Sequence, residues 1–402
     1  MTTEPVTQPE PELESEFEYE VDFATGQPYP IWERARRECP VIHTERGMVD
    51  RSSYHVTRYE DVERVLRDGQ TFSSSINAEH IGQYMGELIL AMGGAEHRAY
   101  RNLVAHAFRA SALERWDEQL IRPTITRLLD EIAPAGRADV VEAITSKYPV
   151  QVICGIVGVP LEDSAQFHRW AELINTGPLH PDDGHAASQA MRDYLEPIVD
   201  DRRRSPRDDL ISDLVHAEID GHRLTDEKIY GFLRLLLPAG AETTYRVMGN
   251  ALVALLTHPD TMAQVVGDRS LMPAVIEETL RWETSVTQVS RVAVTDTEIH
   301  GCPVEAGAPV SVLAGSANRD ESRYDAPEEW RIDRPPQHHL AFGTGQHQCL
   351  GMHLARLELR VGLDEILTRL PNLRLDPDAP PPLIQGFAFR GPDSIPVVFD
   401  PS

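Results

Sequence analysis

The chain has 402 residues, 41% hydrophobic and 25% charged, the composition of a soluble globule that can bury a large core. Its formal net charge of −26 argues against nucleic acid or an anionic membrane as a general partner, because both would be repelled. Four scattered cysteines, without a C-x-x-C pair or a basic and apolar leader, argue against a disulfide framework, a zinc site and a secretory signal. No stretch is apolar enough to span a membrane, so we expect a cytoplasmic protein.

The N-terminal part is predicted to be an acidic, disordered tail over residues 1–28, followed by one domain over residues 29–402. Residues 1–20 hold seven glutamates and no basic side chain, a composition that buries too little to order itself. After a short helix from residue 30, alternating segments predict a small sheet. Residues 71–92 lack clear periodicity and predict a long loop with occasional helical turns.

A helix is predicted over residues 96–104, where His97 and Arg101 stand four residues apart and share one face. Two positive donors on one face suit an anion. By composition alone, a solvated helix face is the commoner explanation of such a pair.

Helical patterns follow along most of the next hundred residues, and they cover residues 112–132, 143–157, 162–175, 187–203 and 208–215. The longest predicted helix runs from Asp226 to Thr257 and is apolar on nearly every side, so it must be central. Pro238 removes one backbone hydrogen bond in its middle, and a kink is predicted there. Just beyond, residues 239–244 read A-G-A-E-T-T; on structural grounds alone, Thr243 is expected to donate its hydroxyl to the Ala239 carbonyl.

A further helix is predicted over residues 271–282 and carries Glu278 and Arg281 in an E-x-x-R pattern. Such a pair is usually a surface ion pair that stabilises the protein by about 0.3 kcal/mol, and by itself it does not indicate a function. Short strands are predicted after Arg291, around residues 292–294 and 299–304.

Residues 342–351 read F-G-T-G-Q-H-Q-C-L-G and bring Cys349 to the start of a predicted helix. There the free amides and the positive end of the helix dipole favour a thiolate, which is a good axial ligand for a metal. A lone cysteine beside a helix is more often a small buried hydrophobic residue. The pattern of phenylalanine, glycines, histidine and Cys349 favours the interpretation of Cys349 as a ligand, because six residues at fixed spacing rarely occur together by chance.

This loop resembles the haem-binding loop of the cytochrome P450 family, and the H-x-x-x-R, A-G-x-[DE]-T-T and E-x-x-R patterns precede it in the family's order. The resemblance implies a mainly α-helical fold with small β-sheets (α+β), in which haem b lies between the long kinked helix and the cysteine loop. Cys349 would be the thiolate ligand of the iron. Glu242 and Thr243 would be catalytic, with Thr243 bonding dioxygen and Glu242 bringing protons from solvent.

The resemblance also implies the remaining roles. The residues that would contact haem are His97, Arg101, Ala239, Gly240, Arg291, Phe342, Gly343, His347 and Gly351. The residues that would line the substrate pocket are Pro238, Val286, Val289 and Phe387.

Two departures from the family pattern stand out. Pro238 replaces a simple aliphatic residue and would reshape the wall above the haem. Glu329 stands where many members have an arginine that braces Glu278 and Arg281; Arg331 or Arg334 would then substitute, or the brace has only two members.

The activity implied is a haem-thiolate monooxygenase that hydroxylates a small to medium hydrophobic substrate with dioxygen and two electrons. The electrons would come from an iron–sulfur ferredoxin and its NAD(P)H-dependent reductase, because the sequence shows no flavin or ferredoxin module. A basic stripe of His353, Arg356 and Arg360 is a docking site for that carrier or a solvated helix face. We expect a monomer; the alternatives are a peroxide-dependent peroxygenase and, less favoured, a non-catalytic haem sensor or carrier.

Overall fold

The computed structural model describes residue 19 and residues 26–45, 51–105, 108–219 and 222–402. Most of the predicted tail over residues 1–28 therefore lies outside the described residues. Within it, the Tyr19 hydroxyl accepts a hydrogen bond of 3.2 Å from the indole of Trp32, and the Gly26 carbonyl accepts one from Arg390. These contacts join both residues to the folded domain.

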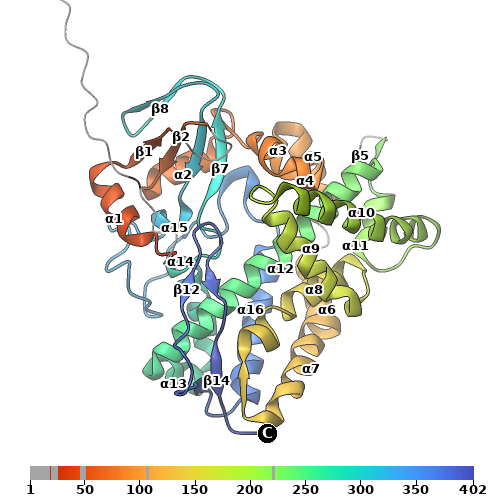
Figure 1. Cartoon of the computed structure of the whole chain (residues 1–402), viewed down its shortest axis with the longest axis vertical. Helices are drawn as coiled ribbons and strands as arrows, with labels where there is room; N and C mark the ends of the chain where they lie inside the picture. The colour runs from red at the N-terminus through yellow and green to blue at the C-terminus, as the bar shows by residue number, and fades with distance from the viewer. Residues whose placement is uncertain (1–18, 20–25, 46–50, 106–107, 220–221) are drawn as a thin grey trace, which may run out of the picture.

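Helices make up most of the architecture (Figure 1). They are α1 (Tyr29–Glu38), α2 (Tyr59–Arg67), α3 (Ile76–His80), α4 (Gly82–Met85), α5 (Gly94–Ala105), α6 (Ala110–Trp116), α7 (Arg122–Ile132), α8 (Tyr148–Val157), α9 (Ser164–Asn175), α10 (Pro181–Arg204), α11 (Leu210–His216), α12 (Asp226–Thr257), α13 (Pro259–Gly267), α14 (Met272–Trp282), α15 (Ala314–Ala317) and α16 (Met352–Arg369). The loop predicted over residues 71–92 contains the two short helices α3 and α4.

The strands are short and form five separate sheets among the described residues. They are β1 (Val41–Thr44), β2 (Ser53–Val56), β3 (Phe72–Ser73), β4 (Arg137–Asp139), β5 (Glu218–Ile219), β6 (His222–Arg223), β7 (Val289–Ala293), β8 (Thr297–Ile299), β9 (Cys302–Val304), β10 (Pro309–Val312), β11 (Arg374–Leu375), β12 (Ile384–Gln385), β13 (Gly391–Pro392) and β14 (Pro396–Val398). The largest sheet has the order β1-β2-β10-β7-β3, in which β2 and β10 are parallel and the other pairs are antiparallel.

Helix α12 crosses the middle of the molecule and packs against α8, α9, α14 and α16 (Figure 1). Its start is capped by the Thr225 hydroxyl, which accepts a hydrogen bond of 3.4 Å from the Lys228 amide. The helix continues unbroken through Pro238, and the kink expected at that position stays a prediction. Because α12 is apolar on nearly all sides, it forms the centre of the larger of two hydrophobic clusters; the smaller cluster lies under the five-stranded sheet.

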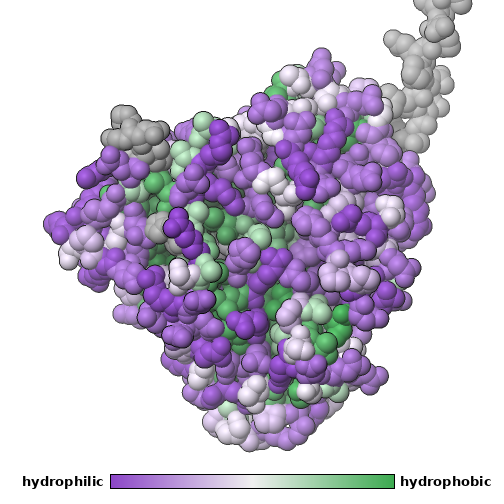
Figure 2. All heavy atoms as spheres, turned by 180° about the vertical axis from the view of Figure 1, so that it is seen from behind, coloured by the Kyte–Doolittle hydropathy of each residue, from purple (hydrophilic) through white to green (hydrophobic). Residues whose placement is uncertain are grey.

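On the face opposite the view of Figure 1, polar side chains cover most of the surface, and apolar ones show mainly in the hollows between them (Figure 2). Among the described helices, none is both long and apolar enough to cross a lipid bilayer.

Candidate active site

The loop over residues 342–351 folds into a tight turn that presents the Cys349 sulfur. The Cys349 amide donates a hydrogen bond of 2.9 Å to the Phe342 carbonyl and closes the loop on itself. Gly343 and Gly345 have φ angles of 61° and 77°, which L-residues with side chains rarely adopt. A side chain at Gly345 would also place its Cβ 2.8 Å from the Leu66 carbonyl oxygen. The glycines therefore permit the turn and its close approach to α2.

Helix α16 begins at Met352, three residues after Cys349, so the expectation that Cys349 stands at the helix start is corrected. Burial raises the pKa of the Cys349 thiol, whereas the Gly351 amide, Arg101 and Arg356 oppose that rise. The expected stabilisation of the thiolate is therefore present but is outweighed by desolvation. The Cys349 side chain nevertheless keeps accessible surface.

Four basic side chains from three segments gather beside this loop. Helix α5 contributes His97 and Arg101, strand β7 contributes Arg291, and the loop itself contributes His347. The His97 and His347 rings lie 4.2 Å apart between centroids. Arg101 donates a hydrogen bond of 2.7 Å to the Gln348 carbonyl, and Arg291 donates one of 2.8 Å to the Ser290 carbonyl.

The pKa values show that these four groups crowd one another. Desolvation and the charges of Arg291, His97 and Arg101 lower the pKa of His347 to about 3. Burial lowers the pKa of Arg291 to about 10. The His97 Nδ1 atom is buried and has no hydrogen-bond partner within the described residues. A cluster of this kind is suited to bind a group that carries more than one anionic oxygen.

Residues 239–244 of α12 form the segment that was expected to face the haem. Ala239 is exposed although it lies in the middle of a buried helix, and the Thr243 hydroxyl donates a hydrogen bond of 2.9 Å to its carbonyl. Glu242 is buried and points towards α9, where one carboxylate oxygen lies 3.1 Å from His168 Nε2. Its other oxygen lies 3.5 Å from an Arg246 nitrogen. In this arrangement Glu242 is held by His168 and Arg246.

A buried ion-pair network joins α14 to the loop over residues 325–334. Both oxygens of Glu278 accept hydrogen bonds from Arg281, at 2.7 and 2.8 Å, and one of them also accepts a bond of 2.8 Å from Arg334. Arg334 therefore occupies the third position of the brace, and Glu329 contributes only its backbone carbonyl. Arg331 pairs instead with exposed acids, at 3.6 to 3.8 Å.

The segments expected to line the substrate pocket meet across a single antiparallel bridge between Val286 and Phe389. Residues paired in this way direct their side chains to the same face. Phe389 is 38% exposed, and Val286 and Val289 are half-buried. Phe387 is half-buried, and its ring lies 5.8 Å from that of Trp32 in α1. Pro238 is buried within α12.

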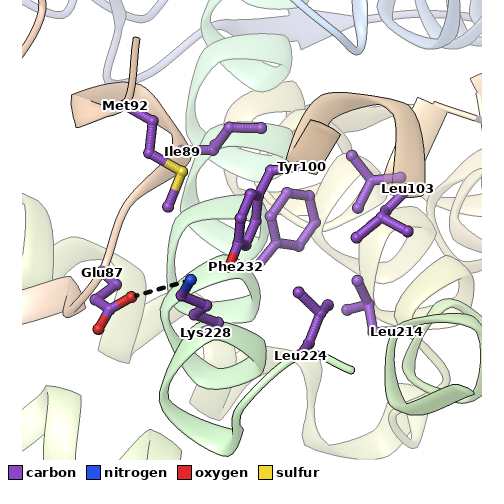
Figure 3. A pocket seen from close by; sticks show the side chains of 10 residues that line it. Glu87, Ile89, Met92, Tyr100, Leu103, Leu214, Leu224, Lys228 and Phe232 are labelled. Atoms are coloured by element: carbon purple, nitrogen blue, oxygen red, sulfur yellow. Dashed lines mark ion pairs between the residues drawn. The ribbon is translucent and has the colours of Figure 1, made fainter. Parts of the chain in front are cut away.

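A separate cavity lies between α5, α11, α12 and the segment before α5 (Figure 3). Its walls include Met92, Tyr100 and Phe232, and at its mouth Lys228 Nζ lies 3.8 Å from Glu87. The volume is about 10 Å³, which is room for about one water molecule. This cavity is too small to be the substrate pocket.

Together, the residues fit a flat, rigid group that carries a metal and two carboxylates. Cys349 offers a soft thiolate, and the basic cluster of His97, Arg101, Arg291 and His347 offers donors to the carboxylates. Gly343 and Gly351 have no atom within 4 Å of the position of an added Cβ, so the loop has room beside the sulfur. These features define a haem-thiolate protein.

The chain belongs to the cytochrome P450 family. A sequence model described as "Cytochrome P450" matches residues 166–392. A "Steroid C26-monooxygenase" from Mycolicibacterium smegmatis is 35% identical over 412 aligned residues, covering 100% of this chain and 98% of the relative. A "Mycinamicin IV hydroxylase/epoxidase" from Micromonospora griseorubida is also 35% identical and covers 90% of this chain and 94% of the relative.

The solved structures agree with this assignment. A structure described as CYP109E1 from Bacillus megaterium in complex with testosterone has a TM-score of 0.84 and 32% identity, and the alignment covers 93% of this chain and 99% of that one. The mainly helical P450 fold, the haem cofactor and the monooxygenase class are thus confirmed.

One contact of the site could not be expected from the sequence. His168 lies 74 positions before Glu242, and no motif links the two residues. The segment over residues 387–389 was expected to turn back towards the pocket, and Phe389 in that segment is paired with Val286.

Proposed function

We propose that this P450 monooxygenase hydroxylates a small to medium hydrophobic substrate and takes its electrons from an iron–sulfur ferredoxin and its NAD(P)H-dependent reductase. The observation that carries the proposal is the gathering of the basic cluster beside the loop that bears Cys349. Haem held there supplies the activation of dioxygen.

The residues of this chain would hold that group on three sides. Cys349 would ligate the iron, and Phe342 would shield the sulfur from water. His97, Arg101 and Arg291 would donate to the propionates, relieving the mutual repulsion that lowers the pKa of His347. The neutral imidazole of His347, whose Nε2 lies 2.9 Å from the Ser74 hydroxyl, would fix the loop against the segment before α3.

Proton delivery would use the acid and the alcohol on α12. The Thr243 hydroxyl, which now donates to Ala239, would donate to dioxygen, and Glu242 would supply protons from the solvent side. Glu242 faces α9 and not Thr243, so it would have to leave His168 or pass its proton through water.

In the basic stripe on α16, His353 and Arg360 would bind the electron carrier, and Arg356 would not. Arg356 bonds both oxygens of Glu277, at 2.6 and 2.8 Å, and covers the Phe342 ring at 4.6 Å. Its charge is thus mostly compensated, whereas His353 and Arg360 are exposed, with one Arg360 nitrogen 3.9 Å from an Asp117 oxygen. A small acidic ferredoxin has the charge to bind this surface.

The proposed pocket wall contains Val286, Val289 and Phe389, which supports an apolar substrate. The names of the relatives mention a steroid and mycinamicin IV, and a bound testosterone is described for one neighbour. We therefore place an alicyclic, steroid-like compound among the first candidates.

The test is a spectral screen of the haem-loaded enzyme followed by turnover. Binding of an apolar compound should shift the Soret band, and product should form with ferredoxin, reductase and NAD(P)H. In Thr243→Ala, NAD(P)H should still be consumed with much less product. Turnover with hydrogen peroxide but not with the redox partners would refute the proposal in favour of a peroxygenase, and unchanged product in Thr243→Ala would refute the relay.

A further inference from the structure

Three potential metal ligands meet where α9 crosses α12. His168 and Glu172 are one turn apart on α9, and Glu242 reaches them from α12. One ligand atom from each lies within 4.8 Å of the others. We propose that His168, Glu172 and Glu242 form a binding site for a divalent transition-metal ion such as Zn²⁺, and that the bound ion inhibits the enzyme by withholding Glu242 from proton delivery.

The distances suit a zinc ion. Zinc binds imidazole nitrogen and carboxylate oxygen at about 2.1 Å, so neighbouring ligand atoms in a tetrahedral site lie about 3.4 Å apart. His168 Nε2 lies 3.1 Å from Glu242 Oε1 and 3.9 Å from Glu172 Oε1. These two separations bracket the required value, and the third pair, Glu172 with Glu242, lies within 4.8 Å.

The exposure of the ligands suits capture from solvent. The side chains of His168, Glu172 and Glu242 are 22%, 58% and 7% exposed, so the site has a buried anchor and an open entrance. With three protein ligands, water would fill the fourth position. The two helices supply rigid backbones, and only the exposed Glu172 has to become ordered.

The charge balance also favours a dication. The groups facing His168 are Glu172 on its own helix and Glu242, Arg246 and the Tyr245 ring on α12. With a neutral imidazole, the two carboxylates and Arg246 leave one net negative charge. Arg246 contacts Oε2 of Glu242, whereas Oε1 faces His168, so a bound ion and the arginine use different oxygens.

Protons compete with the metal for this site. In the metal-free arrangement the imidazole Nε2–H donates to Glu242, and this bond raises the pKa of His168. A metal ion needs the unprotonated nitrogen, so binding to the protonated imidazole must release a proton, and zinc affinity must strengthen as the pH rises through the pKa of His168. Inhibition by zinc should show the same dependence on pH.

The inhibitory effect rests on the proposed function, because it assumes that Glu242 delivers protons. A bound ion would fix the carboxylate to α9 more firmly than a single hydrogen bond does. Electron consumption would continue while product formation fell.

The experiment is calorimetric titration of the haem-loaded enzyme with zinc chloride at neutral pH, with magnesium chloride as the control ion. We expect one zinc site, with binding weakened by about tenfold or more in His168→Gln and in Glu172→Gln. Glu162→Gln, an exposed charge change just before α9, is the matched control and should bind zinc as the wild type does. Equal zinc affinity in all four proteins, or no zinc binding, would overturn the site.

Product formed per NAD(P)H consumed is then measured with and without zinc, and each protein is compared with its own metal-free value. Zinc should lower this ratio in the wild type and in Glu162→Gln but not in Glu172→Gln. Inhibition of the redox partners would affect every variant alike, and that result would overturn the inhibitory effect. Zinc binding that depends on His168 and Glu172 but leaves the ratio unchanged would support the site and refute the relay role of Glu242.

Discussion

The position of Arg334 allows a sharp test of the ion-pair network, in which Arg334→Ala is compared with Arg331→Ala. The two arginines are three residues apart on the same loop. Arg334 is 10% exposed and bonds Glu278, which is itself 6% exposed. Arg331 is 37% exposed, and its side chain makes only long ion pairs with acids that are more than half exposed.

The magnitude follows from the bonds that each side chain makes. Arg334→Ala removes one hydrogen bond to a buried carboxylate, worth about 1.5–3 kcal/mol, and bonds to the Asp325, Ala326 and Glu329 carbonyls, which water can partly replace. Glu278 keeps Arg281 as a partner, so the loss stays below the cost of an unpaired buried charge. We expect about 3 kcal/mol for Arg334→Ala and less than about 1 kcal/mol for Arg331→Ala.

The assay is urea unfolding of the haem-loaded enzyme, followed by circular dichroism and by the Soret band. A difference of about 2 kcal/mol between the variants corresponds to about 30-fold in the unfolding equilibrium. Arg334→Lys should fall between wild type and Arg334→Ala, because lysine keeps the charge but not the planar donor set. Equal midpoints for Arg331→Ala and Arg334→Ala would refute the reasoning.

Three further predictions concern other parts of the molecule. Gly231→Ala should destabilise the protein by about 1–3 kcal/mol, because the added Cβ would lie 2.6 Å from the Glu87 carbonyl oxygen. The control is Gly267→Ala, where no atom lies within 4 Å of the added Cβ and the change should be less than about 1 kcal/mol. Thermal unfolding of the two variants measures the difference. Burial raises the pKa of Glu358 well above its ordinary value of 4.5, so the folded protein binds a proton there more tightly than the unfolded chain does. The proton therefore stabilises the folded protein at low pH, and this stabilisation is lost as the pH rises from about 4.5 to the pKa of the folded state. Glu358→Gln, which cannot ionise, should therefore become more stable relative to the wild type as the pH rises through that range. The free energy of unfolding of both proteins is measured by denaturation at several pH values, and a difference that does not change with pH would contradict this. Cys349→Ser should abolish the red-shifted Soret band of the ferrous carbonyl complex, and a retained band would exclude Cys349 as the iron ligand.

The sequence alone determined the features that depend on local spacing. The bounds of α12 and α14 followed from apolar periodicity and from the Thr225 cap, because helices bury one stripe or, in a central helix, most of their surface. The spacing of the glycines and Cys349 in residues 342–351 identified the haem loop, because this combination of residue types at fixed positions rarely occurs by chance.

Only the tertiary structure decided the contacts between distant segments. In the sequence, Arg331 and Arg334 were equal candidates for the third member of the brace. The path of the loop over residues 325–334 brings the Arg334 side chain, and not that of Arg331, to Glu278. The pairing of His168 with Glu242 depends on how α9 crosses α12, and the pKa of Cys349 depends on how much protein surrounds the sulfur. Crossing positions and desolvation are properties of the packed chain, so no local pattern encodes them.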